Sequence, residues 1–416
     1  MNELRSSPFI AVIIAATVFR IAFALYTPNW QAPDEYAHFY VIRHFAYTNH
    51  FRPSKPEFPL YESYQPPLYY VLAAQLYKAV EHWDTLPPDP NIGVDPDLDK
   101  HPANIALIVL RLFSVALGVV TLLITARIGS ILFLDKQELS LLTVSFVAFL
   151  PTFIVNSSSV TNDALANLVG ALLLLFLVRP GWSYRPLWLG VILSLGILTK
   201  ANLWTFFPLV IVSFCIHRHN IARALKKSLF VTGTVIVLTG WFLVWNYSRY
   251  ENFAAINPGL EASLPFTQHT LGDVWRVLRN INWSFWAAAG RTYQIHLAPL
   301  FYLILFLPPT LVATVGVVKL LSTSAASYSS EEYSRRALWI LLIAFLLEAA
   351  AALSYSLIYP VNCAWGKYLY PVLPAIAVGL VAGTTQLFGK YKAITILPLL
   401  IIALIATDMY LFFNLS

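Results

Sequence analysis

Residues 8–40 read PFIAVIIAATVFRIAFALYTPNWQAPDEYAHFY, and this stretch decides the class of fold. An apolar run, 8–26, is followed shortly by the acidic pair Asp34 and Glu35. A helix needs about 20 predominantly apolar residues to cross the hydrocarbon core of a bilayer. The run therefore predicts a membrane-spanning helix, and the acidic pair then lies where the chain leaves the bilayer.

The same run also fits a secretory signal peptide, because Arg5 precedes it and Ala22-Phe23-Ala24 looks like a cleavage site. However, Arg20 interrupts the apolar stretch, and the best chemical motif of the chain follows directly after Ala24. We therefore favour a retained span over a cleaved leader.

The composition of the whole chain points to a membrane protein. Of its 416 residues, 58% are hydrophobic and only 12% are charged, about half the charged share of soluble proteins. A water-soluble fold leaves too much of its surface in water to hide this amount of apolar material. Disordered and coiled-coil classes are excluded by the same figures. We interpret Cys215 and Cys363, which are far apart in the sequence, as free thiols.

Apolar runs recur along the chain, and eleven of them are long enough, or nearly so, to span a bilayer. We therefore expect an all-α polytopic membrane protein with about 11 transmembrane helices, forming a single domain over 1–416. The runs are 8–26, 104–124, 139–156, 162–178, 186–200, 202–216, 228–247, 298–318, 337–358, 368–388 and 393–413.

Basic residues fall mainly in alternate gaps between these runs, which sets the orientation. With the N-terminus cytoplasmic, the outer gaps hold few cations, with Lys200 and Lys367 as the exceptions. The net charge of +6 is thus a signature of topology, and no nucleic-acid partner is expected. The inner cations are Arg5, Arg127, Lys136, Arg179, Arg185, Arg218, Arg223, Lys226, Lys227, Lys319, Arg335, Arg336, Lys390 and Lys392.

Two outer segments are long, 27–103 and 247–297, and both are rich in aromatic residues, proline and mixed charges. In the first, apolar residues recur at helical spacing over 34–47 and 66–83. We expect two amphipathic helices there, lying on the outer membrane face.

The sharpest motif is Asp34-Glu35-x-x-His38, at the start of the first of these helices. The acids could simply cap the helix and favour its dipole. His38 lies one turn after Asp34, on the same face, and capping does not explain it. A carboxylate here could act as a general base, and the three side chains could also contribute to a divalent-cation site. We expect no obligatory cofactor.

Further polar residues lie at the outer ends of the spans, where ionisable groups are costly and usually face a partner. Lys200 interrupts an apolar stretch on the side where positive charge is disfavoured, and the alternative is that it snorkels to lipid phosphate. Asp163 could instead cap the span that begins near 162. The other candidates are Asn162, Arg291, Lys367 and Tyr368 at the outer ends, and Tyr64, Gln65 and Tyr69 in the first long segment.

These residues resemble a known class of membrane enzyme. The acidic pair in the first outer segment, the two flanking helices and the many spans are similar to the GT-C fold, as in protein O-mannosyltransferases and the lipid A aminoarabinose transferase. Gln65-Pro66-Pro67-Leu68-Tyr69-Tyr70 and the Gly366-Lys367-Tyr368 stretch look like an uncharacterised bacterial family of this type. Those proteins commonly carry arginine where Lys367 stands.

The resemblance implies transfer of a sugar from a polyprenyl-phosphate donor to a lipid, glycan or protein hydroxyl. It implies a site on the extracytoplasmic side of a prokaryotic inner membrane. Asp34 would be the general base, aided by Glu35 or His38. Lys200, Arg291 and Lys367 would bind the donor phosphate, and Tyr64, Gln65, Tyr69, Asn162, Asp163 and Tyr368 would line the substrate pocket.

Two other classes remain open. A lipid-linked glycan flippase would explain the spans and cations, but it predicts paired halves with broken helices at the midplane, and we find no such repeat. A polysaccharide or O-antigen ligase or polymerase would place its chemistry in the late outer segment 247–297, which holds His269 and several arginines.

Overall fold

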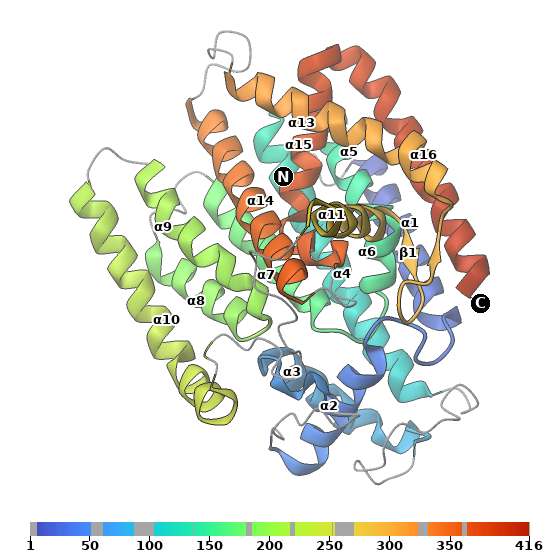
Figure 1. The fold of residues 1–416 in the computed structure, drawn as a ribbon, viewed down its shortest axis with the longest axis vertical. Coiled ribbons are helices and arrows are strands. Elements are labelled where there is room, and N and C mark those ends of the chain that lie inside the picture. The colour runs from blue at the N-terminus through green and yellow to red at the C-terminus, as the bar shows by residue number, and fades with distance from the viewer. Residues whose placement is uncertain are drawn as a thin grey trace.

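The computed structural model describes residues 6–50, 61–86, 104–134, 136–179, 185–216, 221–251, 253, 270–322, 332–359 and 364–415. These residues are almost entirely helical, with one two-residue strand pair (Figure 1). Cys363 and His269 lie outside them.

The elements follow in this order. They are α1 (Ser7–Tyr26), α2 (Glu35–Thr48), η2 (Tyr61–Tyr64), α3 (Leu68–Val80), η3 (Glu81–Trp83), α4 (Ile105–Leu132), α5 (Gln137–Ala148), α6 (Pro151–Asn156), α7 (Asp163–Val178), α8 (Pro186–Ile197), η6 (Ala201–Thr205), α9 (Phe206–Ile216), α10 (Ile221–Tyr250), α11 (Leu271–Trp286), β1 (Ala288–Ala289), β2 (Ile295–His296), α12 (Pro299–Phe301), η8 (Tyr302–Phe306), α13 (Leu307–Ser322), α14 (Glu332–Ile358), η9 (Gly366–Val372), α15 (Leu373–Phe388) and α16 (Lys390–Leu415).

Each predicted apolar run overlaps a helix, which confirms the all-α polytopic fold class. Seven helical segments of the described chain are long and apolar enough to cross a bilayer. Four more, at 137–148, 163–178, 186–197 and 201–216, are apolar but only 10–17 residues long. The count of eleven crossings stays a prediction.

Two of the predicted runs are broken near their C-terminal ends. The run 139–156 divides into α5 and α6, because Pro151 starts a new helix and cannot continue the old one. The run 186–200 ends at Ile197, and Lys200 has an extended backbone before η6. Both breaks place polar side chains at a span end instead of inside a continuous helix.

The helices pack around a central group made of α4, α5, α7 and α15, with α1 against α4. In Figure 1, α8, α9 and α10 lie to one side of this group and α16 lies to the other. α2 and α3 pack on each other at the lower end of the view. Most of α2 is buried in protein, so it is held by its neighbours as well as by any membrane surface.

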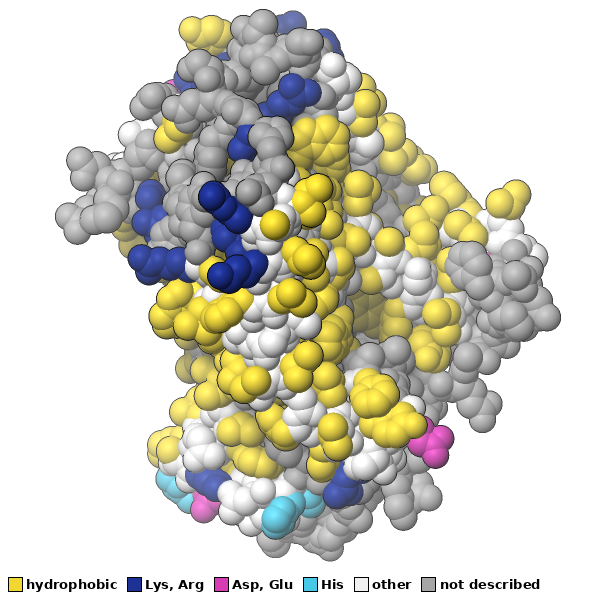
Figure 2. All heavy atoms as spheres, turned by 90° about the vertical axis from the view of Figure 1, so that its left-hand side faces the viewer, with side chains coloured by type: hydrophobic (Ala, Val, Ile, Leu, Met, Phe, Trp, Pro, Cys, Tyr) yellow, Lys and Arg dark blue, Asp and Glu magenta, His cyan; other side chains and the backbone are white. Residues whose placement is uncertain are grey.

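Charge and apolar surface are separated on the outside of the molecule. On the face in Figure 2, lysine and arginine gather toward one end, and a broad hydrophobic zone follows. The exposed cations at the start of α8 and α10 include Arg185, Arg223 and Lys226. This arrangement suits a helix bundle in a bilayer.

Arg20, the charge inside the first span, is fully buried in the protein. Its Nε donates to Ser157 Oγ at 2.9 Å and its Nη1 to the Ala148 carbonyl at 2.9 Å. The cation therefore contacts neighbouring helices and does not face lipid, which is how a span tolerates it.

Candidate active site

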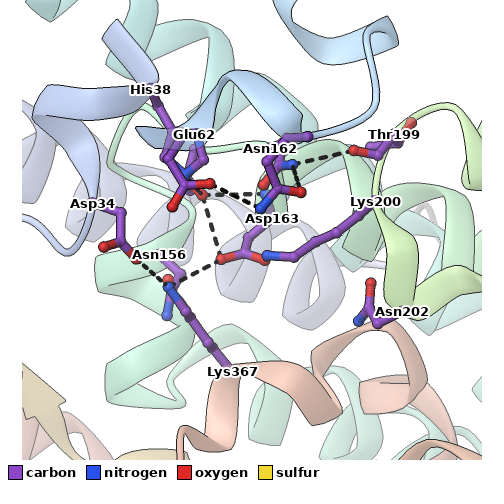
Figure 3. Close-up of polar contacts among 12 residues, drawn as sticks. Asp34, His38, Glu62, Asn156, Asn162, Asp163, Thr199, Lys200, Asn202 and Lys367 are labelled. Carbon is purple, nitrogen blue, oxygen red and sulfur yellow. Dashed lines mark hydrogen bonds and ion pairs between the residues drawn. The ribbon is translucent and has the colours of Figure 1, made fainter. Parts of the chain in front are cut away.

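Four charged side chains from separate parts of the chain meet next to the first outer segment (Figure 3). Lys367 Nζ lies 3.0 Å from Asp34 Oδ2 and 3.6 Å from Asp163 Oδ2. Lys200 Nζ forms an ion pair with the other oxygen of Asp163. Asp34 precedes α2, Asp163 begins α7, Lys200 precedes η6 and Lys367 lies in η9. We call these four residues the charge cluster.

Burial makes this cluster unusual. The side chains of Lys367 and Asp163 are 5% and 4% exposed, whereas that of Asp34 is 37% exposed. Buried charges need partners, and here two cations are matched by two carboxylates. Lys200 is 9% exposed and paired with protein, so the snorkelling interpretation is wrong. Asp34 is the member of the cluster that a ligand from solution can reach most easily.

The backbone and the pKa of Asp34 fit a chemical role better than a capping role. Its φ is 58°, in the left-handed region that non-glycine residues rarely adopt. Its side chain makes no capping hydrogen bond to α2. Burial alone would raise the pKa of Asp34, but the ammonium groups of Lys367 and Lys200 outweigh it and hold that pKa below its usual range. Asp34 is therefore a carboxylate at neutral pH.

His38 is the neutral partner of this cluster. Its Nδ1 lies 2.8 Å from the Tyr70 hydroxyl and its Nε2 lies 3.4 Å from Thr161 Oγ1. Thr161 Oγ1 in turn donates to Asp163 Oδ2 at 3.3 Å. Burial lowers the pKa of His38 to about 3, so the imidazole is uncharged at neutral pH. A line of hydrogen bonds thus joins α3 to Asp163 through His38.

Glu35 points away from the charge cluster and into a buried ion pair. Arg111 of α4 donates to both of its carboxylate oxygens, at 2.8 and 2.6 Å, and Glu35 is 0% exposed. The Val160 N–H donates to the same carboxylate at 3.0 Å. Arg111 also donates to the carbonyls of Ala24, Thr27 and Pro28. Glu35 therefore fixes the segment that carries Asp34, which is a positioning role and not contact with a substrate.

Polar residues of the first outer segment form a series of hydrogen bonds that continues to Asn162. Gln65 Nε2 donates to Glu62 Oε2 at 2.9 Å and to the Tyr64 hydroxyl at 3.0 Å. Asn162 Nδ2 donates to Gln65 Oε1 and to the Thr199 carbonyl, both at 3.2 Å. Burial and the nearby Asp34 charge raise the pKa of Glu62 to about 7.

The remaining predicted residues do not all lie at the charge cluster. Tyr368 lies with its ring centroid 6.0 Å from Lys200 Nζ, at the cluster. Tyr69 is 0% exposed and packs on Phe113, so it belongs to the core. Arg291 is exposed and its Nε donates to the Trp30 carbonyl at 3.1 Å. This hydrogen bond joins Arg291 to the first outer segment.

The fold was compared with known proteins. No family model matches the sequence, and no curated protein matches it. The oligosaccharyltransferase of Archaeoglobus fulgidus, tethered to an acceptor peptide with the NVT sequon, matches 100% of this chain and 55% of its own, with TM-score 0.53 and 12% identity. Its complex with Zn and sulfate matches 96% of this chain and 52% of its own, with TM-score 0.52 and 12% identity.

The chain has the GT-C fold. It spans about half the length of that oligosaccharyltransferase. ArnT from Cupriavidus metallidurans bound to undecaprenyl phosphate matches 91% of this chain and 78% of its own, with TM-score 0.41 and 13% identity. At 12% identity the likeness to the oligosaccharyltransferase concerns the fold alone, which is the predicted one. The roles of individual residues must come from the site itself.

A divalent cation does not fit this GT-C site. The described residues contain no group of three or more His, Cys, Asp or Glu side chains that could hold a metal. The suggested set of Asp34, Glu35 and His38 does not converge, because Glu35 binds Arg111. Where Asp34 and Asp163 approach each other, the ammonium of Lys367 lies next to both.

The sequence did not single out several residues of the site. Glu62 stood among aromatic residues and prolines and resembled an ordinary surface acid. Glu348 of α14 accepts hydrogen bonds from Asn202 and Thr205, which lie in η6 just after Lys200, and it is 1% exposed. A carboxyl group inside an apolar run was a usable signal for Glu348. Arg111 could have been found in the same way.

Proposed function

We propose that this chain is a membrane glycosyltransferase that moves a sugar from a polyprenyl-phosphate donor to an acceptor hydroxyl. The reaction takes place on the extracytoplasmic side of a prokaryotic inner membrane, with the N-terminus in the cytoplasm. The acceptor is a lipid, a glycan or a protein. The observation that carries the proposal is the buried charge cluster, in which a partly exposed carboxylate, Asp34, lies beside two cations.

The Asp34 carboxylate suits removal of the acceptor proton, and the two lysines suit departure of the donor phosphate. The acceptor oxygen attacks the anomeric carbon, its proton passes to the Asp34 carboxylate, and the bond from that carbon to the phosphate oxygen breaks. The electron pair leaves with the phosphate, whose charge Lys200 and Lys367 stabilise by charge-assisted hydrogen bonds. One displacement inverts the anomeric centre.

Three features support this assignment together. The fold is that of an oligosaccharyltransferase. The cluster lies at the outer ends of apolar helices, where a lipid-anchored donor can present its phosphate. Asp34 is ionised at neutral pH, so it can accept a proton, and its neighbours are cations suited to a phosphate.

The first test is Asp34→Asn in the purified full chain, assayed for transfer from a radiolabelled polyprenyl-phosphate sugar. Loss of a general base lowers the rate by about 10²–10⁴-fold. Glu81→Gln is the matched control, because Glu81 is exposed on η3 in the same segment. Full activity in Asp34→Asn would end the assignment.

The second test concerns the cations. Lys200→Met keeps the apolar stem of the side chain and removes the charge, so we expect about tenfold weaker binding of undecaprenyl phosphate. Lys226→Met, at an exposed lysine of α10, is the control. A variant that binds the lipid as tightly as wild type removes Lys200 from the scheme. Transport without transfer would favour a flippase.

A further inference from the structure

The hydrogen bonds around Gln65 fix which polar atoms remain for a ligand. Gln65 uses its amide hydrogens on Glu62 and Tyr64, and its oxygen accepts from Asn162. The Asn162 amide nitrogen faces two acceptors, Gln65 Oε1 and the Thr199 carbonyl. This pattern sets the orientation of both amides, because a flipped amide would bring two acceptors together.

This series leaves one buried acceptor without a partner. Asn162 Oδ1 is buried without a hydrogen-bond partner, and Asn162 is 0% exposed. Glu62, bonded to the same glutamine, is 7% exposed, and its hydrogen bond with Gln65 is made through Oε2. Buried acceptors without partners cost free energy. The missing group must therefore be a hydrogen-bond donor.

The charges around these atoms favour a neutral donor over a phosphate as that group. Glu62 is an acid, and within the described residues it forms no ion pair with a lysine or arginine. The cations of the site lie instead at Asp34 and Asp163 (Figure 3). A phosphate is an acceptor and an anion, so it belongs on the lysine side. A sugar offers several hydroxyl donors in a small space.

We infer that Glu62, Gln65 and Asn162 form a hydroxyl-binding subsite that takes the sugar of the donor, an inference that rests on the proposed function. Its place fits the covalent structure of such a donor. The sugar is bonded directly to the phosphate, so its subsite must adjoin the phosphate site. Asn162 immediately precedes Asp163, which pairs with both lysines.

The surroundings of the subsite also suit a sugar. Tyr64 is buried beside Glu62 and receives a hydrogen bond from the same glutamine. Burial, with Glu62 and three further tyrosines close by, raises the pKa of Tyr64, so its hydroxyl stays protonated. Aromatic side chains give a sugar an apolar face to lie on and a polar group at the edge.

The experiment measures equilibrium binding of two kinds of probe to the full chain in lipid nanodiscs. One probe is undecaprenyl phosphate alone, and the others are undecaprenyl phosphate carrying glucose, mannose or galactose. We expect wild type to bind its best sugar-bearing probe more tightly than the bare lipid. Glu62→Gln turns an acceptor into a donor. It should weaken the binding of that probe by about tenfold and leave the affinity for the bare lipid unchanged. Glu81→Gln is the control.

A pH series on wild type gives the same information without a substitution. Protonation of Glu62 near pH 7 removes an acceptor, in a setting that also contains Asp34, Lys200 and Lys367. The affinity advantage of the sugar-bearing probe should therefore be larger at pH 8 than at pH 5.5, and this difference should vanish in Glu62→Gln.

The outcomes separate this inference from the proposed function. Equal weakening of both probes by Glu62→Gln, or no change in either, overturns the subsite. So does a wild type that binds every sugar-bearing probe no better than the bare lipid. Failure of wild type to bind the bare lipid would instead count against the phosphate site and hence against the proposed function.

Discussion

Replacing Arg111 by methionine tests the conclusion that Glu35 is structural. The guanidinium makes five hydrogen bonds, two to Glu35 and three to carbonyls of 24–28. In Arg111→Met the carboxylate of Glu35, which is 0% exposed, keeps the Val160 N–H as its donor. Removing one partner of a buried ion pair costs about 3–5 kcal/mol. For a chain of this size that corresponds to a melting temperature lower by about 3–6 °C.

The assay is thermal unfolding of the purified chain in detergent, with the double variant Arg111→Met/Glu35→Gln as the decisive comparison. The double variant no longer buries an unpaired charge, so it should recover at least half of the lost stability. Glu35→Gln alone, assayed below its melting temperature, should transfer sugar faster than Asp34→Asn. Unchanged melting of Arg111→Met, or strictly additive losses in the double variant, would refute the reasoning.

Three further predictions follow from the site. The raised pKa of Glu62 means that the folded chain binds its proton more tightly than the unfolded chain does, so this group contributes stability below pH 4.5 that is lost as the pH rises through about 7. Melting curves should therefore show a larger stability gain for Glu62→Gln at pH 8 than at pH 5, and an equal gain at both would contradict this. EDTA should leave transfer unchanged. In Lys367→Ala the ammonium between Asp34 and Asp163 is gone, so these two carboxylates should bind Mn²⁺, measurable by electron paramagnetic resonance. Tight Mn²⁺ binding by wild type would count against the lysine arrangement. A Cβ added to Gly366 would lie 2.2 Å from Phe285 N. Gly366→Ala should therefore displace η9 and weaken the binding of undecaprenyl phosphate. Gly233→Ala is the control, because a Cβ at Gly233 meets no atom within 4 Å.

Much of the fold could be predicted because a bilayer imposes a length and a composition on each span. The apolar runs and the break at Pro151 are local properties of the sequence. The division of 139–156 into two helices was missed, since the run remains apolar on both sides of that proline. Length alone does not show whether the four short helices cross the membrane.

The charge cluster was partly visible for the same reason. Lys200 and Lys367 stood out because positive charge is disfavoured in outer gaps, and Asp34 stood out because it follows a span. The role of Glu35 depends on Arg111, which is 76 residues away, and no local pattern reveals that pair. Glu62 gained its importance from burial, which the sequence did not indicate.

The contact of Lys367 with both Asp34 and Asp163 has a kinetic consequence. With no substrate present, the ammonium offsets the charge of Asp34 and makes that carboxylate a poor proton acceptor. An arriving phosphate competes for the same ammonium, which leaves Asp34 more basic at the moment when the leaving group is in place. The order of events then favours donor before acceptor, because Asp34 becomes a strong proton acceptor only when the donor phosphate is bound.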